Sequence, residues 1–209
     1  MNESRYTFNW GTNMDKRKIT ENLICESFKN MLLKYPFEKI TIKRITDEAG
    51  IIRPTFYNYF QDKYELLERY LKNDIMDSAD NLIENNMDQE AVKLIFIRFE
   101  KNKAFYRKAF EVKGQNSFES ILHDNIQEIF KKIFIHHEYT PEKSLGLFDL
   151  DNISKYYTNG LIFIIKSWLD NDYDTSVDKL IEGYFYLMTH STADILGEPV
   201  RNHDKESHL

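Results

Sequence analysis

The sequence of 209 residues is poor in the residue types that break helices or cross-link chains, with seven glycines, four prolines and one cysteine. So few glycines and prolines disfavour a sheet built on tight turns and favour long helices. The one cysteine, Cys25, excludes a disulfide within the chain and fits a reducing compartment. No apolar run reaches the ~18 residues of a membrane span, and residues 1–13 lack the apolar stretch of a secretory signal. These absences predict a cytoplasmic protein with no membrane partner.

The sequence also lacks the common motifs of enzymes, cofactor sites and metal sites. It has no Gly-rich phosphate loop, no Ser nucleophile turn, no HExxH pair and no cysteine-rich zinc pattern. Cys25 shares a helical face with Phe28 and Leu32, which indicates a small core residue. His136 and His137 are adjacent, and adjacent side chains on a helix point apart, so we do not expect them to share a metal. The sequence thus predicts a protein that is not an enzyme and has no cofactor or metal.

The sequence does contain a large apolar fraction at helical spacing. Hydrophobic residues make up 42% and aromatic residues 14%, which is enough for a sizeable core. Their period predicts an all-α protein of about nine helices, near residues 15–33, 42–49, 53–59, 62–82, 88–100, 102–111, 116–136, 150–171 and 176–195. Residues 1–13 and 197–209 lack this period and are expected to form a flexible arm and a disordered tail. We assign residues 14–62 to one helical domain and residues 63–196 to a second.

The most informative stretch runs from Thr41 to Phe60. Thr41 is a good N-cap for a short helix, and Gly50 supplies the turn that ends it. Pro54 then stands where the first turn of a second helix tolerates proline. Two short helices joined by such a turn form a helix-turn-helix, whose second helix enters the DNA major groove. This layout predicts an N-terminal three-helix domain that reads double-stranded operator DNA.

The second helix of this motif has an apolar face and a polar face. Three aromatic side chains are spaced to pack inward, namely Phe56, Tyr59 and Phe60. Four polar side chains can point outward, namely Arg53, Thr55, Tyr57 and Asn58. Hydroxyl groups suit phosphates, whereas Arg and Asn suit guanine and adenine edges. The polar set is therefore the predicted DNA-contacting surface of the motif.

Basic residues flank the motif. Lys16, Arg17 and Lys18 stand at the start of the first predicted helix, where cations oppose the helix dipole at a cost of roughly 0.3–1 kcal/mol each. Lys63 repeats this arrangement at the start of the helix that follows the motif. A DNA phosphate would offset the repulsion, and ordinary solvated charge is the alternative explanation.

The distribution of charge supports DNA binding only through its asymmetry. The net charge is −6, but residues 14–75 hold 12 Lys and Arg against 10 Asp and Glu, while residues 76–209 hold 15 against 23. The positive balance of the first region is below that of a strongly basic DNA-binding domain. This leaves open a rival interpretation, in which the same fold binds a protein partner in place of DNA.

The stretch from about residue 16 to residue 68 resembles the N-terminal domain of the TetR family of bacterial transcription regulators. The matching positions are Thr41, Ala49-Gly50-Ile51, Arg53, Pro54, Thr55, Phe56, Tyr57, Tyr59-Phe60 and Lys63. Two positions depart from the family pattern. Arg44 replaces a residue that is often acidic and would add a contact to phosphate or base, so Thr41 and Arg44 join the predicted DNA contacts. Ile52 replaces a serine cap, which would weaken the start of the second helix.

The resemblance also implies roles for the later helices, which in TetR-like proteins pair two subunits and often enclose a small-molecule effector. The positions that suit a homodimer interface are Ile153, Tyr157, Gly160, Leu161, Ile164, Trp168, Leu180, Ile181, Tyr184, Phe185 and Met188. The candidate residues of an effector pocket are Phe96, Phe99, Tyr106, Phe118, Leu122, His123, Tyr156 and Phe163. Aromatic residues at this spacing more often form core alone, and that alternative stays open here.

Residues 156–180 further resemble the C-terminal domain of the activators of dihydroxyacetone kinase operons, a TetR-like branch. The sequence as a whole therefore predicts a homodimeric TetR-like regulator of a near-palindromic operator. The expected switch is a small effector or a protein co-regulator. Repression is the commoner behaviour in the family, whereas the C-terminal resemblance favours activation.

Overall fold

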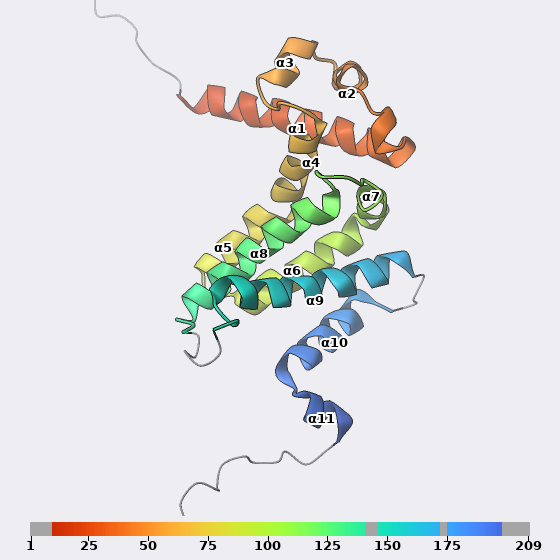
Figure 1. Cartoon of the computed structure of the whole chain (residues 1–209). Coiled ribbons are helices and arrows are strands. Elements are labelled where there is room, and N and C mark those ends of the chain that lie inside the picture. The colour runs from red at the N-terminus through yellow and green to blue at the C-terminus, as the bar shows by residue number, and fades with distance from the viewer. Residues whose placement is uncertain (1–9, 141–145, 172–174, 198–209) are drawn as a thin grey trace, which may run out of the picture.

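The computed structural model describes residues 10–140, 146–171 and 175–197, and its regular structure there is entirely helical (Figure 1). The elements are α1 (Trp10–Lys34), η1 (Phe37–Lys39), α2 (Ile42–Ala49), α3 (Arg53–Tyr57), α4 (Lys63–Leu71), η2 (Lys72–Met76), α5 (Asp77–Glu84), α6 (Asp88–Lys101), α7 (Lys103–Ala109), α8 (Phe118–His136), α9 (Leu150–Asp170), α10 (Val177–Thr189) and α11 (Thr192–Leu196). The predicted all-α class is confirmed. Eleven α-helices occupy the described ranges, partly because Ser191 and Asp194 form a capping box that starts α11 as a separate helix.

Helices α1, α2 and α3 lie at one end of the molecule, with α2 and α3 on the same side of α1 (Figure 1). Their shared core includes Phe28, Ile45 and Phe56, which are fully buried. Cys25 is also buried, and burial raises the pKa of its thiol to about 12, so the prediction of a core cysteine is confirmed. Helix α1 begins at Trp10, so the expected arm is wrong for residues 10–13. Residues 1–9, and residues 198–209 of the expected tail, lie outside the described part.

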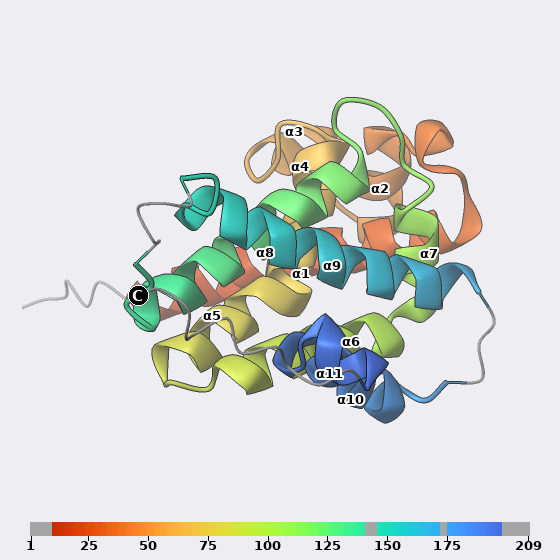
Figure 2. The same cartoon turned by 60° about the horizontal axis from the view of Figure 1, so that its bottom comes forward.

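Helix α4 leads from this end into the remaining helices, where α8 and α9 lie side by side (Figures 1 and 2). The core between them and α6–α7 is rich in aromatic side chains that are at most 1% exposed, namely Phe96, Phe99, Phe105, Tyr106 and Phe118. Among the helices that the structure describes, none combines the length and hydropathy of a membrane span.

The expected single helix from Asp62 to Leu82 is interrupted by a π-helical segment, η2, between α4 and α5. Such widened turns occur frequently at functional sites. The carboxylate of Asp74 in η2 accepts hydrogen bonds from the Tyr106 hydroxyl and, at 3.0 Å, from the Asn102 side-chain amide. The Asn102 side-chain carbonyl accepts a further bond from Lys29 Nζ of α1 at 2.8 Å. These contacts join α1, the π-helical segment and the junction of α6 with α7.

Candidate nucleic-acid interface

The turn between α2 and α3 is formed by local sequence signals. Thr41 Oγ1 accepts a hydrogen bond from the Arg44 backbone N–H at 3.3 Å and so caps α2. Gly50 has φ 65°, in the left-handed region that favours glycine, and ends α2. Ile52 occupies the N-cap of α3 and gives no side-chain hydrogen bond, as expected for a position that lacks serine. Because α3 covers only Arg53–Tyr57, it depends on packing for its position.

An aromatic underside provides that packing. Phe56 and Phe60 are 0% and 2% exposed, and their ring centroids are 5.6 Å apart. Tyr59 is half-buried and packs against the same core. The predicted inward orientation of these three residues is confirmed. The underside fixes the orientation of α3, and therefore which of its side chains face solvent.

The opposite side of α3 presents Arg53, Tyr57 and Asn58 to solvent, and Thr55 is half-buried. Arg53 Nη2 donates a hydrogen bond to Tyr57 Oη at 2.9 Å, and the guanidinium carbon lies 5.5 Å from the centroid of the Tyr57 ring. The two residues are four positions apart and so are neighbours on the helix surface. Each side chain restricts the other, so the guanidinium and the phenol are held together on the exposed face.

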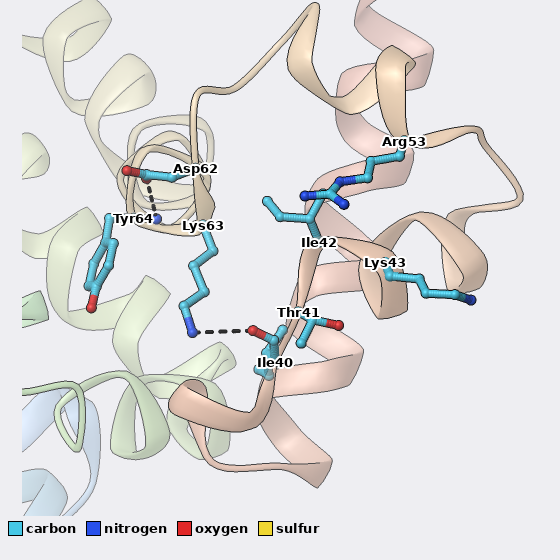
Figure 3. A pocket seen from close by; sticks show the side chains of 8 residues that line it. All are labelled: Ile40, Thr41, Ile42, Lys43, Arg53, Asp62, Lys63 and Tyr64. Carbon is cyan, nitrogen blue, oxygen red and sulfur yellow. Dashed lines mark hydrogen bonds between the residues drawn. The ribbon is translucent and has the colours of Figure 1, made fainter.

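A hollow of about 410 Å³ lies between the starts of α2, α3 and α4 (Figure 3). Lys43, Arg53 and Lys63 bring three basic side chains to its lining. Figure 3 shows that these side chains take different directions: Arg53 lies over Ile42, Lys43 points away, and Lys63 reaches toward Ile40. The hollow is therefore edged by positive charge without being a single cationic cluster.

Lys63 is engaged inside the subunit. Its ammonium donates hydrogen bonds to the backbone carbonyls of Phe37, at 2.7 Å, and Ile40, at 3.2 Å, and burial lowers the pKa of the Lys63 amine. Asp62 caps α4 by accepting bonds from the backbone N–H groups of Tyr64 and Glu65, at 2.8 and 2.9 Å. The start of α4 therefore already has a negative partner. A contact between Lys63 and a phosphate would require its bonds to the carbonyls to break.

The predicted repulsion between the helix dipole and Lys16, Arg17 and Lys18 is wrong, because α1 begins at Trp10 and these residues lie in its second and third turns. The dipole effect falls off within the first turn. All three side chains are nevertheless exposed, and the Arg17 guanidinium lies 5.8 Å from the ring centroid of Tyr59. The cluster thus stands beside the segment that follows α3, and its positive charge remains available to a ligand there.

Helix α2 carries two basic residues, of which sequence reasoning selected only one. The Arg44 guanidinium lies 5.0 Å from the Tyr35 ring centroid, and Nη1 donates a hydrogen bond to the Lys39 carbonyl at 3.4 Å. Lys43 is not among the predicted DNA contacts, although it is exposed, lines the hollow and pairs with Asp47 at 2.6 Å. Its position next to Arg44 on the same short helix was the signal that could have identified it.

Comparison with known proteins agrees with this geometry. Residues 29–70 match the profile of a family described as bacterial regulatory proteins, tetR family, and residues 85–190 match one described as transcriptional regulator C-terminal region. Together these matches cover both ends of the molecule. The chain belongs to the TetR family of transcription regulators.

Individual TetR relatives are similar along most of the chain. The HTH-type dhaKLM operon transcriptional activator DhaS of Lactococcus lactis is 31% identical over 130 residues, which are 60% of this chain and 66% of that protein, just under two thirds. A structure described as the dihydroxyacetone kinase operon activator DhaS has a TM-score of 0.60 at 24% identity, covering 82% of this chain and 94% of its own. A TetR-family regulator from Syntrophomonas wolfei has a TM-score of 0.63 at 16% identity, covering 89% and 100%. The last two likenesses concern the fold alone.

The residues predicted to line a TetR effector pocket do not converge on one cavity. Phe96, Phe99, Tyr106, Phe118 and Leu122 are fully buried and belong to one core, in which the rings of Phe99 and Tyr106 lie 4.1 Å apart. His123 is half-buried, with Nδ1 3.7 Å from the Asp124 carboxylate. Tyr156 and Phe163 are 67% and 70% exposed. Their assignment to an internal pocket is therefore wrong, because they occupy the outer face of α9.

The residues predicted for the TetR dimer interface are also divided by the structure. Leu161, Trp168, Ile181 and Tyr184 are buried within the subunit, so their assignment to a surface between subunits is wrong. Ile153 is partly buried, and another group is partly buried against the same core: Tyr157, Ile164, Leu180, Phe185 and Met188. Gly160 is exposed. The apolar residues that do face solvent on α9, α10 and α11 are Tyr156, Phe163, Tyr186, Leu187, Ile195 and Leu196.

A second hollow, of about 270 Å³, lies between α6, α8, α9 and α10. Its lining is mostly apolar and includes Phe130, Phe134, Tyr157, Phe185 and Met188. Asp88, His137 and Tyr184 add polar groups, and the buried Tyr184 hydroxyl has no hydrogen-bond partner within the described part of the chain. Four residues predicted for the dimer interface thus line this hollow instead: Tyr157, Tyr184, Phe185 and Met188.

Proposed function

We propose that this TetR-family regulator reads operator DNA through the exposed face of α3, with Arg53 contacting a base edge and Tyr57 contacting a phosphate. The observation that carries this proposal is the division of α3 into a buried aromatic underside and an exposed pair of Arg53 and Tyr57. Arginine makes bidentate hydrogen bonds to guanine in the major groove, and a phenol hydroxyl suits a phosphate oxygen. Lys16, Arg17, Lys18, Lys43 and Arg44 supply further positive charge around α3.

The test is a gel-shift titration of Arg53→Ala and Tyr57→Phe against the DNA upstream of the regulator's own gene. We expect Tyr57→Phe to weaken binding to every sequence. Arg53→Ala should cost about 1–3 kcal/mol and should also relax the preference at one base pair of each half-site. Lys132→Ala is the control for lost positive charge, because Lys132 of α8 pairs with Asp80 of α5, far from α3.

Unaltered binding by both α3 variants would remove α3 as the reading helix. If the wild type gave no specific DNA complex at all, the rival interpretation would gain support, in which the same fold binds a protein partner. The helical circular dichroism of each protein shows whether it is folded, so that a loss of DNA binding caused by misfolding can be recognised.

The proposed regulator is a homodimer, because one α3 per subunit must meet successive major grooves about 34–36 Å apart. We assign the interface to the outer faces of α9 and α10, which lie on one side of the molecule together with α11 (Figure 2). Phe163 and Leu187 are 70% and 53% exposed there. Gly160 and Gly183 are exposed helical glycines at which a Cβ would meet no atom of the subunit within 4 Å. A second helix could therefore approach closely at both positions.

Light scattering at micromolar concentration tests the interface. The wild type is expected to have the mass of a dimer, and Phe163→Glu that of a monomer, because a carboxylate would be buried without a partner. The control is Ile97→Glu on α6, since Ile97 is also exposed, at 46%, but lies outside the proposed face. A monomeric wild type would refute the dimer, and a dimeric Phe163→Glu would refute the assigned face.

A small effector would act by shifting α4, which joins the DNA-binding end to the rest of the chain. We propose the hollow between α6, α8, α9 and α10 as the effector site, because its lining is mostly apolar and includes Tyr184, whose buried hydroxyl has no hydrogen-bond partner among the described residues. Its volume of about 270 Å³ suits a small ligand, just below the usual range of roughly 300–1,000 Å³. An effector must bind the DNA-competent and the DNA-incompetent forms with different affinities, since equal affinity shifts nothing. Tyr184→Phe should then weaken the effector's influence on DNA binding while leaving effector-free DNA binding unchanged.

A further inference from the structure

Asp88, His136 and His137 bring three possible metal-ligand atoms within 4.8 Å of one another. Asp88 is the first residue of α6, and the two histidines are the last residue of α8 and the residue that follows it. His136 Nδ1 and His137 Nε2 lie 3.3 and 2.8 Å from the same oxygen of Asp88, Oδ2. We propose that these three side chains form a site for a divalent transition-metal ion of the Zn²⁺ class.

The two histidines converge because α8 ends between them. Side chains of adjacent residues inside a helix point apart, which was the reason for not expecting a shared metal. His137 is the C-cap of α8, with φ −88° and ψ 18°, and Glu138 has φ 51°. The backbone thus leaves the helical path at His137, and the two imidazole centroids come to 5.2 Å of each other. The expectation that these two side chains point apart is therefore wrong, because it assumed that both residues lie inside the helix.

The distances between the possible ligand atoms are close to those in a tetrahedral zinc site. Zn²⁺ lies about 2.0–2.2 Å from imidazole nitrogen and carboxylate oxygen, so tetrahedral ligand atoms stand roughly 3.3–3.5 Å apart. The separation of His136 Nδ1 from Asp88 Oδ2, 3.3 Å, already has this value. The pair formed by His137 Nε2 and Asp88 Oδ2 is at hydrogen-bond distance, 2.8 Å, and would widen by a fraction of an ångström. Ion entry would displace the protons that now lie between the imidazoles and the carboxylate.

The environment of Asp88 supplies an independent reason for an ion. The side chain is only 14% exposed, and its second oxygen, Oδ1, is buried and accepts no hydrogen bond from the residues that the structure describes. A buried carboxylate oxygen without a partner is destabilising, and a divalent cation would neutralise it. His136 and His137 are 35% and 65% exposed, so an ion could enter from solvent. Two imidazoles and one carboxylate also form the ligand set of catalytic zinc sites, which leave a fourth position for water.

The site would connect the start of α6 to the end of α8. Asp88 and His137 also line the hollow between α6, α8, α9 and α10. A bound ion would therefore hold two walls of that hollow at a fixed separation. This inference goes beyond the proposed function, since metal binding can be measured whether or not the chain binds DNA.

Isothermal titration of the EDTA-treated, full-length chain with Zn²⁺ tests the proposal, and Co²⁺ provides a spectroscopic probe. We expect one Zn²⁺ per chain, and visible Co²⁺ absorption bands of a low-coordinate site with nitrogen and oxygen ligands. His136→Ala and His137→Ala should each weaken Zn²⁺ binding at least about tenfold and abolish the Co²⁺ bands. His137→Ala carries the test if Asp88→Ala fails to fold, because the His137 side chain is mostly exposed.

The matched controls are His123→Ala on α8 and His190→Ala at the C-cap of α10, and both should retain the wild-type affinity. A double substitution of His203 and His208, near the end of the sequence, should also retain it. Absence of saturable Zn²⁺ binding by the wild type would overturn the proposal and leave two histidines that are hydrogen-bonded to Asp88. Binding that survives the His136→Ala, His137→Ala double variant would overturn it as well.

Discussion

The two ends of this molecule obtain their structure in different ways. In α2 and α3, single residues determine single features: Thr41 caps, Gly50 turns, and Phe56 sets the buried side. In α9 and α10, apolar residues occur on most sides of each helix, so the sequence does not indicate which side meets the subunit's own core. Leu161 and Phe163 illustrate this, since they are two positions apart and 0% and 70% exposed. Local signals thus specify the DNA-binding end, whereas tertiary packing specifies the other end.

The two ends of the molecule are in contact with each other and are not independent parts. The rings of Tyr70 in α4 and Phe105 in α7 lie 4.3 Å apart. Asn102 also donates to Asp74 and accepts a hydrogen bond from Lys29 of α1, which connects the two ends. A substitution at one end can therefore alter the structure or stability of the other. The predictions below test how far the two ends depend on each other.

The largest effect is expected from Phe56→Ala. Removal of a fully buried phenyl ring from a short helix should lower the free energy of unfolding by about 3–5 kcal/mol. Specific DNA binding should be lost, because α3 has no side-chain cap to hold it once its underside is gone. Urea denaturation followed by circular dichroism measures the first effect, and hydrogen exchange shows whether α8 and α9 stay protected.

Phe148→Ala is the control for this variant, because it removes the same ring from a position that is 44% exposed and lies outside the DNA-contacting residues and the proposed dimer face. It should change the stability of α1–α3 little. If both variants lowered the free energy of unfolding equally, the exposure of a ring in the single chain would not predict its contribution to stability. The proposed difference between the two ends of the molecule would then be wrong.

An intermediate effect is expected from Asp74→Asn. The new amide would bring N–H donors toward the amide of Asn102, which now donates to the carboxylate at 3.0 Å. Leaving such buried donors unsatisfied costs about 1–3 kcal/mol. Thermal unfolding should show the loss, and because the bonds bridge α1, η2 and the α6–α7 junction, DNA affinity should fall with it.

Asp77→Asn, one residue beyond η2 and exposed, is the matched control and should have little effect. Tyr106→Phe removes only the hydroxyl partner of Asp74 and should reproduce part of the loss. If Asp74→Asn lowered stability without changing DNA affinity, the hydrogen bonds of Asp74 would stabilise only the core. Other contacts of α4 would then have to couple the two ends of the molecule.

Most of the fold could be predicted from the sequence, because helical period, caps and breakers are local properties. The same holds for the buried and exposed sides of α3. The convergence of His136 and His137 on Asp88 could not be predicted, since it depends on the residue at which α8 ends and on a contact across about 48 positions. Nor could the engagement of Lys63 with the carbonyls of Phe37 and Ile40, which becomes visible only when η1 and α4 are packed together.

The smallest effect is expected from Ile52→Ser, which would give α3 the cap that it lacks. Serine at an N-cap contributes roughly 0.5–2 kcal/mol, and Ile52 is 69% exposed, so little burial is lost in exchange. If α3 frays in the free protein, a gain of about 1 kcal/mol would tighten operator binding by up to about fivefold, because less ordering would be needed on contact. Gel-shift titration measures this change, with Ile52→Ala as the control that removes the same side chain but adds no cap. Equal operator affinities of the serine and alanine variants would mean that the aromatic underside alone already holds α3 in its binding orientation. A side-chain cap at the start of α3 would then be dispensable.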